Sequence, residues 1–120
     1  MAKRPKERVA VYVGELIDAT DEVLSKSALS ASEMSEGDTY KAALMNVQIV
    51  GESIRAIREH HAEWYHRHTT DDWSEIIETR HQISHHFTAL TPQAIIRMIS
   101  SGQLQRIKDQ ALSALAKDPS

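Results

Sequence analysis

The sequence predicts an all-α protein, an up-and-down bundle of four main helices with room for a short fifth. Apolar residues recur at intervals of three and four along most of the chain, the spacing of one face of a helix. The 120 residues include only four glycines and three prolines, so few positions interrupt a helix. A chain of this length buries one hydrophobic core. We therefore expect a single domain over residues 1–120, with frayed ends at 1–6 and 117–120.

Each of the first two main helices is predicted from one apolar stripe. The first spans about residues 6–28, and turn chemistry marks 30–37 as a connector. The second runs from an N-cap at Asp38 to about His60. Its interior includes Gly51, at a cost of roughly 1 kcal/mol relative to alanine. Close approach of a neighbouring helix would explain that glycine.

The middle of the chain contains a polar segment and a third helix. Residues 61–70 are polar and are predicted to be irregular, with Trp64 and Tyr65 closing the edge of the core. The third helix begins at a cap, Thr70 or Asp71, and extends to about residue 87.

The last helix has a clear start. Threonine suits the cap and proline the first helical position, so Thr91 followed by Pro92 predicts a helix that begins there. The apolar stripe continues to about Ala116, with a kink expected at Gly102.

Composition excludes several classes of protein. The formal net charge is −3, whereas proteins that hold nucleic acid by broad phosphate neutralisation are basic, so any RNA contact must be local or built from more than one chain. There is no cysteine, hence no disulfide or thiolate metal site. The basic start MAKRPKER lacks the apolar region of a signal peptide, and no apolar run reaches the ~18 residues of a membrane span. We expect a cytoplasmic protein without a membrane segment.

The candidate chemical centre lies in the third helix. All seven histidines fall between His60 and His86. On a helix, Arg80, Ser84 and Phe87 share the apolar face, while His81 and His85 stack on an adjacent face. Arg80 and His85 are separated by about 140° around the axis. They converge if the helix ends or bends near His85, or if a two-fold partner supplies a second pair.

An arginine on an apolar face needs a partner for its charge. We nominate Glu52, at the core edge of the second helix. The residues alone leave open a purely structural Arg80–Glu52 pair, with His85 a surface histidine one turn on.

Three stretches of the sequence resemble a known family. Arg80, four intervening residues and His85 resemble the arginine–histidine motif of HEPN domains. The segment from Asn46 to Glu52, with Gly51, and the approach from Trp73 to Arg80 resemble the HepT-like toxins more narrowly. The likeness covers roughly residues 10–100.

The resemblance implies a HEPN-like homodimer whose motifs meet at a two-fold cleft. It implies a metal-independent ribonuclease that needs no cofactor, and a toxin encoded beside a nucleotidyltransferase-like antitoxin. His85 would act as general acid and base. Arg80 would stabilise the phosphate transition state, leaving 2′,3′-cyclic phosphate and 5′-hydroxyl ends. His81 would contact or orient the phosphate, and Ser84 could hydrogen-bond at the cleft floor.

Two positions depart from the family pattern. Phe87 stands where these toxins commonly carry a tyrosine that the antitoxin can adenylylate, and His86 replaces a commoner glycine. Phenylalanine has no hydroxyl to modify. Inhibition would then proceed by steric masking, or by modification elsewhere, for example on Tyr65.

Two other functions are consistent with the sequence. A catalytically inactive HEPN module would use the same cleft to bind a nucleotide or a protein partner, and Phe87 favours it modestly. A metal-dependent hydrolase would use the histidines from His60 to His68, or the pair His81 and His85.

Overall fold

The computed structural model describes residues 6–85 and 91–119, with the backbone alone described for Ala31 and for residues 79–85. These residues form seven helices and no strand, so the all-α prediction is confirmed, while the expected count of four main helices and one short helix is not matched. The helices are α1 (Val9–Leu24), α2 (Ala31–Met34), α3 (Gly37–His60), α4 (Ala62–His68), α5 (Asp71–His85), α6 (Pro92–Ser100) and α7 (Gln103–Lys117).

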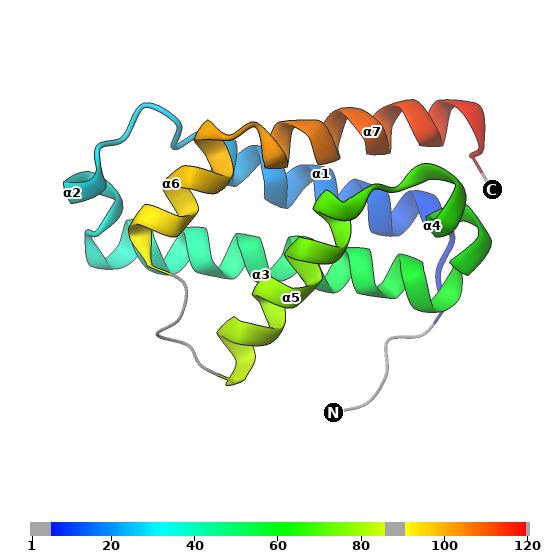
Figure 1. Ribbon diagram of the computed structural model, residues 1–120, viewed down its shortest axis with the longest axis horizontal. Helices are drawn as coiled ribbons and strands as arrows, with labels where there is room; N and C mark the ends of the chain where they lie inside the picture. Colours follow the sequence, from blue (N-terminus) through cyan, green and yellow to red (C-terminus); the bar gives the residue numbers. More distant parts are fainter. Residues whose placement is uncertain (1–5, 86–90, 120) are drawn as a thin grey trace.

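Three long helices form the body of the bundle. In Figure 1, α1, α3 and α7 run alongside one another, and α5 slants across α3. The most extensive helix contacts join α1 to α3 and α3 to α5. Helix α4 lies at the end of the bundle where the chain finishes, and α2 lies at the opposite end beside α6 (Figure 1).

The core is built from the apolar stripes that predict the helices. Burying these side chains supplies most of the stability of a helical bundle, because the stability of a helix in a protein comes mainly from the packing of its apolar face. The largest fully buried side chains are Trp73, Tyr12, Leu16, Met34, Ile54, Ile57, Ile76, Ile95, Leu104 and Ile107.

The segment predicted to be irregular contains a helix. Residues Ala62–His68 form α4, in contrast to the expected loop. Trp64 and Tyr65 are 3% and 7% exposed, which confirms that they close the core. Both rings contact Trp73 edge-on, at centroid separations of 6.4 and 6.5 Å. This aromatic packing stabilises a short helix whose own sequence is polar.

The predicted connector 30–37 also contains a helix, α2. The Ser30 hydroxyl accepts from the backbone N–H of Glu33 at 3.2 Å, and the Glu33 carboxylate accepts from the N–H of Ser30 at 3.1 Å. This reciprocal pair is a capping box. Helix α3 then starts at Gly37, slightly earlier than the cap predicted at Asp38.

The predicted last helix is two helices, since the kink at Gly102 is a complete break. Gly102 has φ +81°, in the left-handed region that glycine adopts without strain. The predicted start is confirmed, because the Thr91 hydroxyl accepts from the N–H of Ala94 at 3.1 Å.

The end of α7 is held by long-range contacts. Lys117 is the last residue of α7, and Asp118, which follows it, has several partners. Fraying over 117–120 stays a prediction. The Asp118 carbonyl accepts from the indole N–H of Trp64 at 2.9 Å, and its carboxylate pairs with Arg67 at 2.6 Å. Across residues 6–85 and 91–119, no helix is long and apolar enough to cross a membrane.

Candidate functional site

Helix α5 carries the predicted catalytic pair. Its backbone is helical from Asp71 to His85, so Arg80, His81, Ser84 and His85 lie on one helix, as predicted. The five-residue separation places Arg80 and His85 about 140° apart around the axis and roughly 7.5 Å apart along it. The other two predicted positions, His86 and Phe87, lie outside the described residues.

The first half of α5 is firmly anchored. Trp73 and Ile76 are fully buried against α3 and its neighbours. The indole N–H of Trp73 donates to Gln110 Oε1 of α7 at 2.8 Å. The Asp72 carboxylate receives two hydrogen bonds from the Arg106 guanidinium, at 2.9 and 3.1 Å.

This ion pair has an electrostatic consequence. The bonds to Asp72, more than the charge of Glu75, raise the pKa of Arg106 above its usual value.

These contacts tie the first half of α5 to both α3 and α7. Its C-terminal end, which carries the motif, lies on the side away from α7 (Figure 1).

The two α3 residues of the predicted site occupy different faces of that helix. Asn46 and Glu52 are both half-buried, but they lie six positions apart, which corresponds to about 120° around the axis. The Asn46 side-chain N–H donates to the Ala42 carbonyl at 2.9 Å, within its own helix. The contact between Glu52 and Arg80 stays a prediction. Since α5 packs on α3, the two helices that carry these residues are neighbours.

The histidines before α5 take part in separate contacts. His61 Nε2 lies 2.7 Å from the Glu7 carbonyl, and His68 Nε2 lies 3.1 Å from the Asp118 carboxylate. In the part of the chain with described side chains, no three histidine or carboxylate groups converge as a metal site would require. The arrangement does not support the histidine-cluster hydrolase among these residues.

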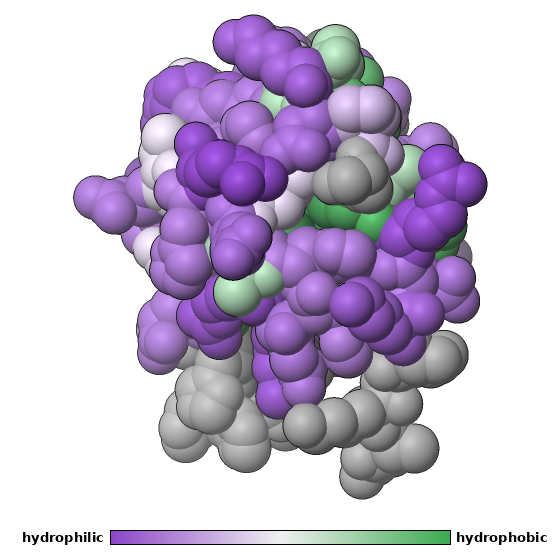
Figure 2. Space-filling view, turned by 90° about the vertical axis from the view of Figure 1, so that its right-hand side faces the viewer, coloured by the Kyte–Doolittle hydropathy of each residue, from purple (hydrophilic) through white to green (hydrophobic). Residues whose placement is uncertain are grey.

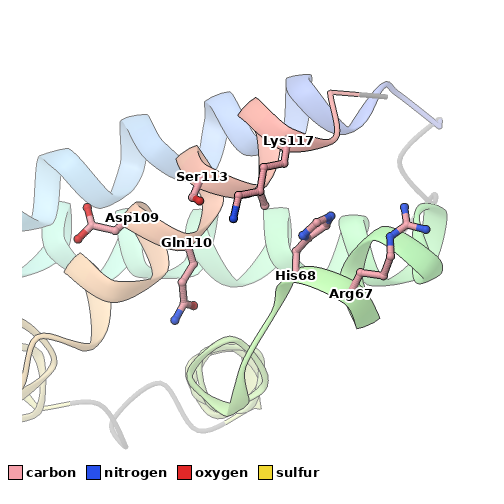
Figure 3. Close-up of a pocket in the computed structure, with 7 residues that line it drawn as sticks. Arg67, His68, Asp109, Gln110, Ser113 and Lys117 are labelled. Atoms are coloured by element: carbon pink, nitrogen blue, oxygen red, sulfur yellow. The ribbon is translucent and has the colours of Figure 1, made fainter.

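A second polar feature was not singled out from the sequence. A cleft of about 340 Å³, here called the α4–α7 cleft, lies between those two helices (Figure 3). Its polar lining includes Arg67 and His68 from α4, and Gln110, Ser113 and Lys117 from α7. The available signal was the polar spacing of three and four along α7, which is equally typical of a solvated helix face.

Comparison with known families gives one match. The family described as Ribonuclease HepT-like matches residues 14–114, which include Asn46, Glu52 and the whole of α5. No curated protein and no solved structure matches the chain. The match spans most of the sequence and agrees with the all-helical fold. The chain therefore belongs to the HepT-like ribonuclease family.

Proposed function

We propose that this protein is a metal-independent endoribonuclease, the toxin of a toxin–antitoxin pair, with Arg80 and His85 as its catalytic residues. The observation that carries the proposal is the family match over residues 14–114, which contains the arginine–histidine motif within α5. Membership of a ribonuclease family supports RNA as the substrate.

The chemistry suits an imidazole and a guanidinium. His85 takes the proton from a ribose 2′-hydroxyl, whose oxygen then forms a bond to the adjacent phosphorus. The bond from phosphorus to the 5′-oxygen breaks, and that oxygen receives a proton. Arg80 holds the phosphate oxygens and stabilises the added negative charge of the five-coordinate transition state. The products are a 2′,3′-cyclic phosphate and a 5′-hydroxyl. The nucleophile is the substrate's own hydroxyl, so the reaction needs no metal to activate water.

The angular separation of the pair supports a site shared by two subunits. Side chains about 140° apart on one helix do not readily reach one phosphate. In a homodimer with the α5 helices facing each other, each subunit contributes to the same cleft. His81 then contacts or orients the phosphate, and Ser84 lies at the cleft floor. Glu52 pairs with Arg80, and Asn46 has a supporting role on α3, the helix that carries Glu52.

Regulation by a nucleotidyltransferase-like antitoxin is part of the proposal. Phe87 offers no hydroxyl for adenylylation. Tyr65 is an alternative acceptor in sequence, but it is only 7% exposed. Its burial favours steric masking of the cleft over modification at Tyr65.

The deciding experiment uses purified wild type and His85→Ala on a mixed RNA pool in EDTA. Wild type is expected to produce RNA with cyclic-phosphate and 5′-hydroxyl ends. His85→Ala, once circular dichroism has shown that it is folded, is expected to produce none. Cleavage undiminished in His85→Ala would rule out the assigned catalytic role. If neither cleaves and Arg80→Ala weakens binding of a partner or nucleotide, the chain is the inactive binding module instead.

A further inference from the structure

The α4–α7 cleft has no part in the reaction described above. Its lining residues belong to α4 and to the second half of α7, two helix segments that lie at the same end of the bundle (Figure 1). Figure 2 views that end, where the visible surface is mostly hydrophilic around a small apolar area. Such a surface is suited to a polar ligand rather than to an apolar helix.

Gln110 presents hydrogen-bond donors to the cleft. Its Oε1 accepts from the indole N–H of Trp73 at 2.8 Å and from the Thr70 hydroxyl at 3.3 Å. An indole N–H only donates, so it determines which end of the amide is the oxygen. Both acceptor positions of that oxygen are used. The NH₂ group is therefore the end of the amide that keeps its hydrogen bonds for a ligand, as a donor.

Two more donors share the same face of α7. Ser113 and Lys117 follow Gln110 by three and seven residues, so all three side chains lie along one stripe about 10 Å long. Figure 3 shows the Lys117 ammonium in the gap beside α7, and the Gln110 side chain extending from α7 toward α5. Within the residues that the structure describes, Lys117 takes part in no ion pair.

Of the two carboxylates near the cleft, Asp118 has a cationic partner among the described residues and Asp109 has only a neutral one. Asp118 pairs with Arg67 Nη2 at 2.6 Å and lies 3.1 Å from His68 Nε2. Asp109 is at the other end of the cleft, where its Oδ1 accepts from Gln105 Nε2 at 3.0 Å. Arg67 has five N–H donors and keeps others for a ligand. Lys117 thus adds a positive charge to several hydrogen-bond donors, while the lining carboxylate without a cationic partner among the described residues, Asp109, lies at the far end of the cleft (Figure 3). A donor set of this kind suits a phosphate group.

We propose that the α4–α7 cleft binds a backbone phosphate of the RNA strand, away from the reacting phosphate. This inference rests on the proposed ribonuclease function. Gln110 is bonded to Trp73, at the start of α5, and α5 extends about 20 Å from its first residue to His85. A single strand that leaves the cleavage site along α5 reaches the cleft within a few nucleotides. A local contact of this kind lets a chain of net charge −3 hold RNA.

Two variants test the cleft without removing its structural bonds. Lys117→Gln removes the charge and keeps a side chain of similar reach. Gln110→Glu keeps an oxygen that accepts from Trp73 and Thr70, but replaces the NH₂ donor with a negatively charged oxygen. Lys41→Gln is the matched control, because Lys41 is an exposed lysine near the start of α3, at the opposite end of the bundle.

Binding is measured by fluorescence anisotropy with a single-stranded RNA whose 2′-hydroxyls are methylated. This RNA keeps its phosphates and lacks the nucleophile, so binding is separated from cleavage. Lys117→Gln and Gln110→Glu are expected to weaken binding by roughly tenfold. For Lys117→Gln, the slope of log affinity against log salt should also fall by about 0.7. Lys41→Gln should bind as wild type does.

The outcomes separate this inference from the proposed function. Wild-type affinity in both cleft variants would overturn the phosphate site, even if RNA cleavage is intact. Loss of antitoxin binding with RNA affinity unchanged would likewise overturn it, and would assign the cleft to carboxylates of a protein partner. Weakened RNA binding in a protein that never cleaves RNA would support the cleft and contradict the nuclease.

Discussion

Ser53 and Thr20 place hydroxyl groups in the core without a hydrogen-bond partner among the described residues. Each hydroxyl loses its hydrogen bonds to water on folding and gains none in return. Ser53 follows Glu52 on α3, the helix against which α5 packs. At the scale of single residues, these two positions reduce the stability of the fold.

Replacing Ser53 by alanine is therefore expected to stabilise the protein. Ser53→Ala removes the unpartnered hydroxyl and leaves the Cβ in place, so the free energy of unfolding should rise by about 1 kcal/mol. Urea denaturation at one protein concentration measures it. Ser100→Ala, at an exposed serine of α6, is the control and should change stability by less than about 0.5 kcal/mol. A lower stability for Ser53→Ala would show that the hydroxyl has a partner in solution.

At the scale of elements, the two short helices show where sequence reasoning reaches its limit. The sequence contains the signal for the capping box of α2, because Ser30 and Glu33 have the required spacing. It contains no such signal for helix α4, because the polar sequence of that helix is not periodic. Trp64 and Tyr65 stabilise it by packing on Trp73, which belongs to another helix.

The capping box predicts a measurable titration. The backbone N–H of Ser30, and then its hydroxyl, lower the pKa of Glu33 from the usual 4.5 by stabilising its carboxylate. The contribution to stability is therefore present above pH 4.5 and is lost as the pH falls through the folded pKa. NMR titration of the Glu33 carboxyl should give a midpoint below 4.5 in wild type. Ser30→Ala removes the hydroxyl but keeps the backbone N–H, so its midpoint should rise and stay below 4.5. A wild-type midpoint at or above 4.5 would contradict the capping role.

The break between α6 and α7 depends on a glycine. Gly102→Ala should lower the free energy of unfolding by about 1 kcal/mol or more, because alanine is strained at φ +81°. Its Cβ would also lie 3.2 Å from Arg106 Nη1. Gly14→Ala is the opposite control, since a Cβ there meets no atom within 4 Å and α1 is helical at that position. It should stabilise by roughly 0.5–1 kcal/mol. If the urea midpoints of both variants shift in the same direction relative to wild type, this account is refuted.

At the scale of the whole molecule, we propose that the site is shared by two chains. If Arg80 of one subunit acts with His85 of the other, Arg80→Ala and His85→Ala subunits complement each other in a mixed dimer. Each variant alone should be inactive, and refolding the two together should restore RNA cleavage well above either. Cleavage of a fluorogenic RNA measures the restored activity, and wild type refolded in the same way is the reference. An inactive mixture of well-formed dimers would place the working pair within one subunit.

The sequence by itself determined the all-helical class, the aromatic edge of the core and the position of Arg80 and His85 on one helix. These follow from apolar spacing and from short motifs, which are local properties of the chain. Only the tertiary structure decided that Gln110 bonds to Trp73, 37 residues away, and that Asp118 pairs with Arg67, 51 residues away. Those contacts shape the α4–α7 cleft and hold the end of α7. They depend on which helix faces meet after packing, and local spacing carries no information on that pairing.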